Sequence, residues 1–216
     1  MKHKRLFIVV DGPEGAGKSM LIRRAATYLE SLVLPFIVTH EPGGTPYGKE
    51  IRDLILYSPH AVQADGKTLF ALFWADRADH MKNKIIPALE EGVIVICDRF
   101  DSATFAYQIV AQGERELESL FWETRESYLG KFEPDMYVHV KLDPGIGLAR
   151  KKEQGEENHI ERKGLEFHRR VSAGLEEFFS RLQPEKVAVI DGSLDKEATW
   201  LAFKAVLDSL LFPKSD

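Results

Sequence analysis

The feature that most constrains the fold is a glycine-rich loop near the start of the chain. Residues 12–19, GPEGAGKS, fit the spacing G-x-x-x-x-G-K-[ST], in which backbone amides turn inward around phosphate oxygens at a helix N-terminus. The apolar run 6–10 before the loop is typical of a buried strand, and residues 20–29 after it have helical spacing. This stretch therefore predicts a strand–loop–helix unit that binds nucleotide phosphates, with Lys18 reaching the β- and γ-phosphates and the Ser19 hydroxyl holding Mg²⁺.

The composition is that of an ordinary soluble globular chain. The 216 residues are 44% hydrophobic and 29% charged, which is enough to bury a core. The net charge of −5 disfavours general nucleic-acid binding, which normally needs a basic excess. The N-terminal apolar run, about five residues, is too short for a secretory signal, and no stretch approaches the ~18 apolar residues of a membrane span. The only cysteine, Cys97, cannot form an internal disulfide, which fits a cytoplasmic protein. From the charge and the apolar run lengths we expect no nucleic-acid or membrane partner.

Strand and helix patterns alternate along the chain. The expected strands are 6–10, 35–40, 93–97, 136–142 and 186–190. The expected helices follow the loop and cover 45–57, 66–91, 102–112, 114–130, 165–182 and 194–210, with a short helix opened by Pro144. Because helices separate all the strands, and VIVIC at 93–97 is typical of a strand buried on both faces, we predict an α/β fold. It would be a five-stranded parallel sheet flanked by helices on both faces, in one domain over residues 1–216.

Polar residues follow directly after three of the predicted strands. Asp11 and the glycine-rich loop follow the first, residues 40–45 the second, and Asp98 with Arg99 the third. Ligands of such sheets bind beyond the carboxyl ends of the strands, so these residues should converge on one edge. An aspartate directly after an apolar strand, as Asp98 is, matches the second Mg²⁺-handling element of P-loop enzymes, although strand-terminal aspartates are equally common as helix caps.

Together the motifs resemble those of bacterial thymidylate kinases, a P-loop nucleoside monophosphate kinase family. In family order the chain has GPEGAGKS (12–19), THEPGGT (39–45), LFWADR (72–77), CDRF (97–100), TFAYQ (104–108), FEPD (132–135) and GLARKKEQGEENHIERKGLEFHRRV (147–171). The combination of EPGGT, DRF and AYQ is the specific part of this set. The resemblance implies a P-loop NTPase fold, phosphorylation of dTMP to dTDP for dTTP synthesis with ATP and Mg²⁺, and a homodimer.

The resemblance also implies roles for individual residues. Expected ATP contacts are Gly12, Glu14, Gly15, Ala16, Gly17, Lys18 and Ser19, and the expected metal ligands are Ser19 and Asp98. Expected dTMP contacts are Asp11, Glu41, Pro42, Phe73, Arg77, Arg99, Thr104, Tyr107, Gln108 and Glu161. Expected catalytic groups are Lys18, Asp98, Arg99 and Lys152.

The acceptor-side roles agree with simple chemistry. Phe73 resembles the aromatic residue that stacks on thymine, and Arg77, four residues later on the same helix face, resembles the donor to a thymine carbonyl. Arg99 resembles the arginine on the acceptor phosphate, and Tyr107 the aromatic ring against the deoxyribose, where it would exclude a ribose 2′-hydroxyl. From the residues alone, Phe73 would be a core aromatic and Arg99 would form a surface ion pair with a neighbouring aspartate.

The charged segment 150–164 differs most from the family. Members whose loop lacks a basic residue at the position of Gly15 normally supply arginines from a lid, yet the matching positions here hold Lys152 and Gln154. A charged run of this kind is more often a solvated face than a lid. We therefore expect the reaction to persist with slow chemistry, because lysine lacks the planar fork of arginine and glutamine lacks its charge.

Two other functions remain open at this point. One is a kinase of another nucleoside monophosphate or of a deoxynucleoside, built on the same sheet. The other is a P-loop regulatory protein that binds a nucleotide and acts on a partner. Guanine specificity is disfavoured, because no N-K-x-D signal follows the fifth strand, where DGS stands at 191–193.

Overall fold

The computed structural model describes residues 5–154 and 160–213, so residues 155–159 of the expected lid lie outside it. Its centre is a parallel sheet in the order β2-β3-β1-β4-β5. The strands are β1 (Phe7–Asp11), β2 (Phe36–His40), β3 (Ile94–Asp98), β4 (Met136–Lys141) and β5 (Val187–Asp191). All five were predicted to within about two residues, because continuous apolar runs between helical segments are a strong local signal.

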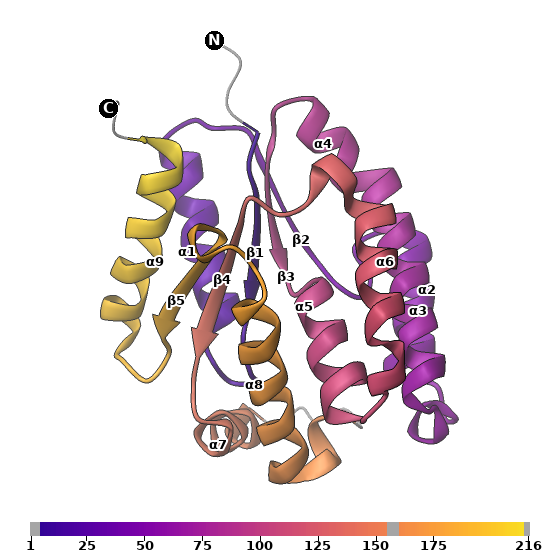
Figure 1. Cartoon of the computed structure of the whole chain (residues 1–216). Coiled ribbons are helices and arrows are strands. Elements are labelled where there is room, and N and C mark those ends of the chain that lie inside the picture. The colour runs from indigo at the N-terminus through magenta and orange to yellow at the C-terminus, as the bar shows by residue number, and fades with distance from the viewer. Residues whose placement is uncertain (1–4, 155–159, 214–216) are drawn as a thin grey trace.

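Helices connect the strands and cover both faces of the sheet (Figure 1). They are α1 (Lys18–Ser31), α2 (Pro46–Leu56), α3 (Gly66–His80), α4 (Ile86–Glu90), α5 (Asp101–Thr104), α6 (Glu118–Leu129), α7 (Pro144–Gln154), α8 (Gly164–Ser180) and α9 (Lys196–Leu211). Single 3₁₀ turns lie at Ala61–Gln63, Arg115–Leu117, Gly130–Phe132, Glu161–Lys163 and Pro184–Lys186. Among the described residues no helix is long and apolar enough to cross a membrane.

Two predicted helices contain π-helical segments. The predicted helix 66–91 runs as α3, a π-helical turn at Met81–Ile85, and α4. The predicted helix 102–112 runs as α5 and a π-helical segment at Phe105–Ala111. Periodicity cannot detect such a one-residue insertion, and π-helical turns often occur at functional sites.

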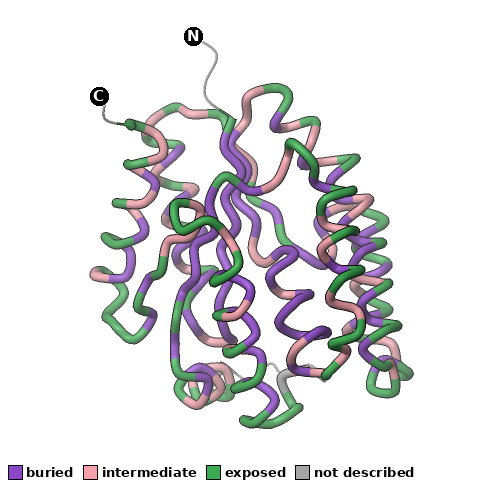
Figure 2. Tube along the Cα trace, viewed as in Figure 1, coloured by how far each residue is buried: buried purple, intermediate pink, exposed green. Residues whose placement is uncertain are grey.

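Side chains of β1 alternate between two hydrophobic cores. Phe7 and Val9 pack into a core with α3, α4, α6 and α8, while Ile8 and Val10 pack into a second core with α1 and α9. The purple strands in Figure 2 show that the middle of the sheet is buried on both sides. The outer strands β2 and β5 are partly exposed, as expected for edges.

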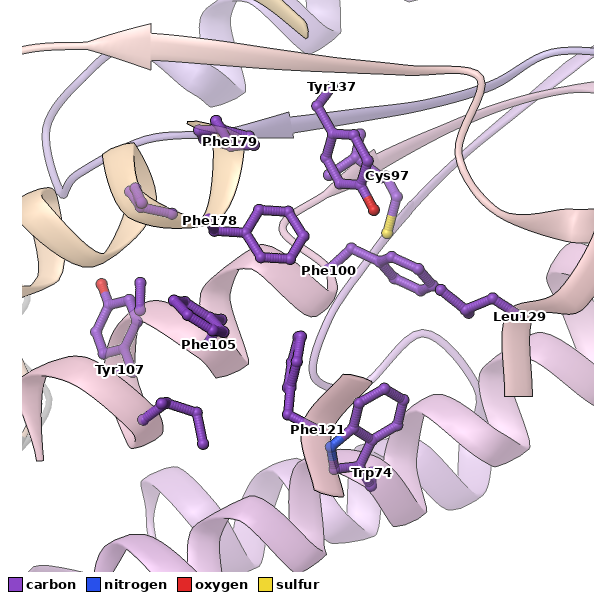
Figure 3. Packing of buried hydrophobic residues seen from close by; sticks show 14 of the residues in the cluster. Trp74, Cys97, Phe100, Phe105, Tyr107, Phe121, Leu129, Tyr137, Phe178 and Phe179 are labelled. Carbon is purple, nitrogen blue, oxygen red and sulfur yellow. The ribbon is translucent and has the colours of Figure 1, made fainter. Parts of the chain in front are cut away.

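The larger core contains many aromatic rings that contact one another (Figure 3). Phe121 contacts the rings of Trp74 and Phe105 edge to face, at centroid distances of 5.6 and 5.3 Å. Trp122 stacks on Phe178 at 5.6 Å, which ties α6 to α8. Aromatic pairs of this geometry stabilise a core beyond the area they bury. They fix α3, α6 and α8 against the sheet and leave the carboxyl ends of the strands open.

Candidate active site

A cavity of about 1220 Å³ opens at the carboxyl edge of the sheet, the lower edge in Figure 1. Its walls come from the loops that follow β1, β2, β3 and β5, together with α3 and the second half of α7. The convergence that the strand-end rule predicts is therefore present. The lining residues include the glycine-rich loop, an apolar pocket formed by Phe73, Phe100 and Tyr107, and the loop after β5.

The glycine-rich loop lies at the start of α1 with a backbone geometry that suits an anion. Gly15 (φ 69°) and Gly17 (φ 92°) adopt the left-handed conformation, which costs glycine little. No side chain caps α1, so the amides of its first turn remain available to an anion. Lys18 is almost fully buried, and its ammonium donates to the carbonyl oxygens of Gly12 (3.0 Å) and Pro13 (2.9 Å). Burial lowers the pKa of Lys18, and the nearby charge of Arg99 lowers it further.

Arg99 joins the edge of strand β3 to the glycine-rich loop. Its guanidinium donates to Asp11 (3.0 Å), to the carbonyl oxygen of Gly12 (3.1 Å) and to Glu14 (2.6 Å). The expected surface pair with a neighbouring aspartate is therefore wrong, because these carboxylate partners lie 88 and 85 residues away in the chain. Arg99 also has φ 65°, a strained value for a residue other than glycine, which is often found where a side chain must be aimed.

The carboxylate of Glu14 lies among several cations. Burial alone would raise the pKa of Glu14, but the charges of Arg99, Lys18 and Lys151 outweigh it and lower this pKa to about 2. Tyr107 also donates to Glu14, at 3.4 Å. The loop carboxylate is therefore charged over the whole physiological range and links the glycine-rich loop to the acceptor side.

Arg77 is completely buried beside the apolar pocket. Its Nε donates to Glu41 (2.9 Å), and its Nη2 donates to Thr104 (3.0 Å) and lies 2.8 Å from the same Glu41 carboxylate as an ion pair. The guanidinium lies 4.5 Å from the ring centroid of Trp74 and 5.0 Å from that of Phe100. Its Nη1 has no hydrogen-bond partner. A buried unpaired donor costs about 1–3 kcal/mol. Arg77 itself does not line the cavity, although Glu41 and Phe100, which it contacts, do.

Of the other residues expected to bind dTMP, some line the cavity and some are buried beneath its surface. Phe73 and Pro42 line the cavity, and Phe73 also packs against the small core of α2 and α3, so its stacking on a base stays a prediction. Tyr107 lines the cavity from the π-helical segment, with the guanidinium of Arg99 5.5 Å from its ring centroid. Gln108 is buried behind it, and its side-chain oxygen has no partner.

A second buried network supports the loop after β2. His80 forms hydrogen bonds with Glu41 (3.0 Å) and Thr39 (2.7 Å), and Asp76 accepts from the amide of Gly43 (2.9 Å). Burial, followed by the charge of Glu41, raises the pKa of Asp76 to about 7. Neither His80 nor Asp76 was predicted from the sequence, because nothing in their local pattern separates them from ordinary polar helix positions.

The metal candidates fit Mg²⁺ only together with a nucleotide. Ser19 and Asp98 both line the cavity. Within the part of the chain that the structure describes, no three His, Cys, Asp or Glu side chains cluster as a preformed metal site. Mg²⁺ commonly binds through one or two protein groups plus substrate phosphates, which a hydroxyl and a carboxylate beside an anion site can supply.

The basic residues of α7 are not arranged as the family positions suggest. Lys152 is exposed and does not line the cavity, whereas Arg150 and Lys151 do. The side chains of Gln154 and Glu161 lie outside the described part of the structure. The loop after β5, residues 192–195, and the first turn of α9 also line the cavity and were not predicted to do so. The strand-end rule would have found this loop, because it follows the fifth strand.

Comparisons with known proteins identify the family. The thymidylate kinase family model matches residues 10–200. The thymidylate kinase of Carboxydothermus hydrogenoformans is 38% identical over 206 residues, covering 94% of this chain and 97% of that protein. That of Gluconobacter oxydans is 38% identical over 212 residues, covering 97% and 98%. The crystal structure of the Ehrlichia chaffeensis thymidylate kinase is similar with a TM-score of 0.75 at 27% identity, covering 95% of this chain and 99% of that one. The chain therefore belongs to the thymidylate kinase family.

Proposed function

We propose that this chain transfers the γ-phosphoryl group of Mg²⁺-bound ATP to dTMP, forming dTDP and ADP, for dTTP synthesis. As a member of its family it is a nucleoside monophosphate kinase that phosphorylates dTMP. The observation that carries the rest of the proposal is the shared cavity, in which the anion site of the glycine-rich loop faces the pocket of Phe73 and Tyr107. Donor and acceptor would meet there, and holding both in place is the main contribution that a protein makes to phosphoryl transfer.

On the donor side the glycine-rich loop would bind the ATP phosphates. The amides of residues 15–19 would surround the anion, and Lys18 would exchange its bonds to the Gly12 and Pro13 carbonyl oxygens for bonds to the β- and γ-phosphates. Ser19 and Asp98 are the residues that would hold Mg²⁺, which offsets charge on the transferred phosphoryl group when bound.

On the acceptor side Arg77 and Phe73 would bind the thymine base. Glu41 and Thr104 fix two nitrogen atoms of the guanidinium and leave Nη1 unpaired, so that a base carbonyl would complete its hydrogen bonding. Phe73 offers an apolar surface to the base from the same helix face. Gln108, with its own unpaired oxygen, would contribute from behind this pocket.

Arg99 and Tyr107 would hold the sugar and phosphate of dTMP. Arg99 already donates from Nη2 to a carboxylate, that of Glu14, and a phosphate oxygen is an acceptor of the same kind. The carboxylate of Asp11 holds the Arg99 side chain in place, because it accepts hydrogen bonds from Arg99 and from the Ser102 hydroxyl (2.6 Å). The ring of Tyr107 would lie against the deoxyribose.

The same proposal covers the organisation of the chain. One kinase domain over residues 1–216, with residues 150–164 as its lid, agrees with the common cavity. A homodimer is supported by the exposed Tyr47, Leu54 and Tyr57 on and just after α2, which packs against α3 at the edge of the molecule (Figure 1). A light-scattering mass of one chain, rather than two, would contradict the dimer. The buried free Cys97 agrees with a cytoplasmic location.

One substrate panel tests the reaction. Purified protein with Mg²⁺-ATP is assayed against dTMP, dUMP, UMP, CMP, AMP and thymidine, and kcat/KM should be highest for dTMP. Higher turnover of another member would favour a kinase of a different nucleoside monophosphate or deoxynucleoside. Nucleotide binding without transfer to any acceptor would favour a regulatory P-loop protein.

A further inference from the structure

The glycine-rich loop has no room for a catalytic cation at its own centre. A side chain at Gly15 would place its Cβ 2.1 Å from the carbonyl oxygen of Gly147 in α7. A side chain at Gly147 would in turn place its Cβ 2.0 Å from the carbonyl oxygen of Glu14. The first turn of α7 thus packs directly on the backbone of the loop, and no side chain can be added at that point of the loop.

Arg150 fastens α7 to the loop. Its guanidinium donates to the carbonyl oxygens of Gly15 (3.4 Å) and Gly192 (3.2 Å). The side chain therefore bridges the glycine-rich loop and the loop after β5, both of which line the cavity. These bonds fix the position and rotation of α7 at the residue before Lys151.

Helical geometry then places Lys151 over the cavity. Positions 147, 150 and 151 share one helix face, because residues three and four apart are neighbours, and Lys151 is about 6 Å along the axis from the contact glycine. Lys151 is half-buried and lines the cavity with Lys18 and Glu14. Lys152 points away from this face and is exposed.

We propose that Lys151 is a catalytic residue of this kinase, and that its ammonium binds a nonbridging phosphate oxygen of the group in transfer. The inference rests on the proposed ATP–dTMP reaction. In that step the bond between Pγ and the ADP oxygen breaks while a bond from Pγ to a dTMP phosphate oxygen forms. Lys151 neutralises charge on the equatorial oxygens while Lys18 serves the donor phosphates. The charge of Lys151 is also one of those that lower the pKa of the neighbouring Glu14 carboxylate, after Arg99 and Lys18.

Single-turnover kinetics and a transition-state analogue test the assignment. Lys151→Ala and Lys151→Gln should lower the phosphoryl-transfer rate by about ten- to hundred-fold, whereas Lys151→Arg should recover most of it. Binding of ADP with aluminium fluoride in the presence of dTMP should weaken by a similar factor, while the Kd values of ADP and dTMP alone should change by less than about three-fold. Lys67→Ala removes an exposed lysine that pairs with Glu116 outside the cavity and should leave all these quantities unchanged.

Three outcomes would overturn the assignment. One is an unchanged transfer rate in both neutral variants, and another is a larger loss in Lys152→Ala than in Lys151→Ala. The third is an equal weakening of ADP and of the analogue complex, which would mean that Lys151 serves ground-state binding or the structure of α7. If wild-type protein forms no dTDP in the same assay, the proposed reaction itself fails, which is a separate result from a failure of Lys151.

Discussion

Replacing Gly15 by alanine should destabilise the protein far more than an ordinary glycine substitution. The backbone at this residue has φ +69°, and a Cβ there would lie 2.1 Å from the Gly147 carbonyl oxygen, with the carbonyl carbon at 2.7 Å. Both atoms belong to backbone, so no side chain can rotate away to relieve the contact. Either the glycine-rich loop or the start of α7 must shift.

The size of the effect follows from two contributions. A left-handed conformation costs a residue with a Cβ about 1–2 kcal/mol. Forcing an extra carbon into a packed contact costs about 1–3 kcal/mol more. The free energy of unfolding of Gly15→Ala should therefore fall by roughly 2–5 kcal/mol, equivalent to a decrease in Tm of about 4–20 °C for a chain of this size.

Gly113→Ala is the matched control. Gly113 has φ +87°, but a Cβ added there would meet no atom within 4 Å, so only the conformational cost of about 1–2 kcal/mol applies. Denaturant titrations of the wild type and both variants, with m-values compared to verify similar unfolding transitions, measure the difference. Equal losses in the two variants would refute the close packing of α7 on the loop. They would also remove the geometric reason for placing Lys151 over the cavity.

Three further predictions concern the reaction and its supports. Lys18→Ala should lower kcat about hundred-fold or more with little change in the Kd of dTMP, and near-normal turnover would show that the loop does not serve catalysis. Tyr107→Ala should raise the kcat/KM of UMP relative to dUMP while Tyr107→Phe preserves the ratio, because ring bulk excludes the 2′-hydroxyl; an unchanged ratio in the alanine variant excludes this role. Asp76 keeps its proton in the folded protein up to a pKa of about 7, against 3.8 ordinarily, so its contribution to stability falls as pH rises between these values. Asp76→Asn should therefore be more stable relative to wild type at about pH 8 than at about pH 4, by at most about 4 kcal/mol, and a pH-independent difference measured by urea unfolding would contradict the shift.

Local pattern was enough to predict most of the architecture. The five strands are short apolar runs bounded by helical segments, and a strand of β-rich residues buried on both faces needs little information from elsewhere in the chain. The glycine-rich loop is specified by eight consecutive residues, so its position between β1 and α1 could be predicted as well. The strand-end rule then brought distant motifs to one edge without any coordinates.

Partner choice within the site could not be predicted in this way. Arg99 was expected either beside a neighbouring aspartate or on a substrate phosphate, but in this structure it donates to Asp11 and Glu14. Those contacts exist because β3 lies next to β1 in the sheet, which the chain order does not state. Arg77 similarly depends on Glu41 from a different loop and on Thr104 from a different helix.

The sequence by itself determined the class of fold, the anion-binding loop and the edge at which ligands bind, since each follows from residues close together in the chain. Only the tertiary structure decided which cations face the cavity. Lys151 and Lys152 are adjacent and chemically identical, yet one lines the cavity and the other is exposed. The difference is the rotation of α7, which the contact between Gly147 and the loop backbone and the two bonds from Arg150 set. Arg150 and Gly15 are 135 positions apart in the chain, so their contact exists only once the sheet has brought the loops together.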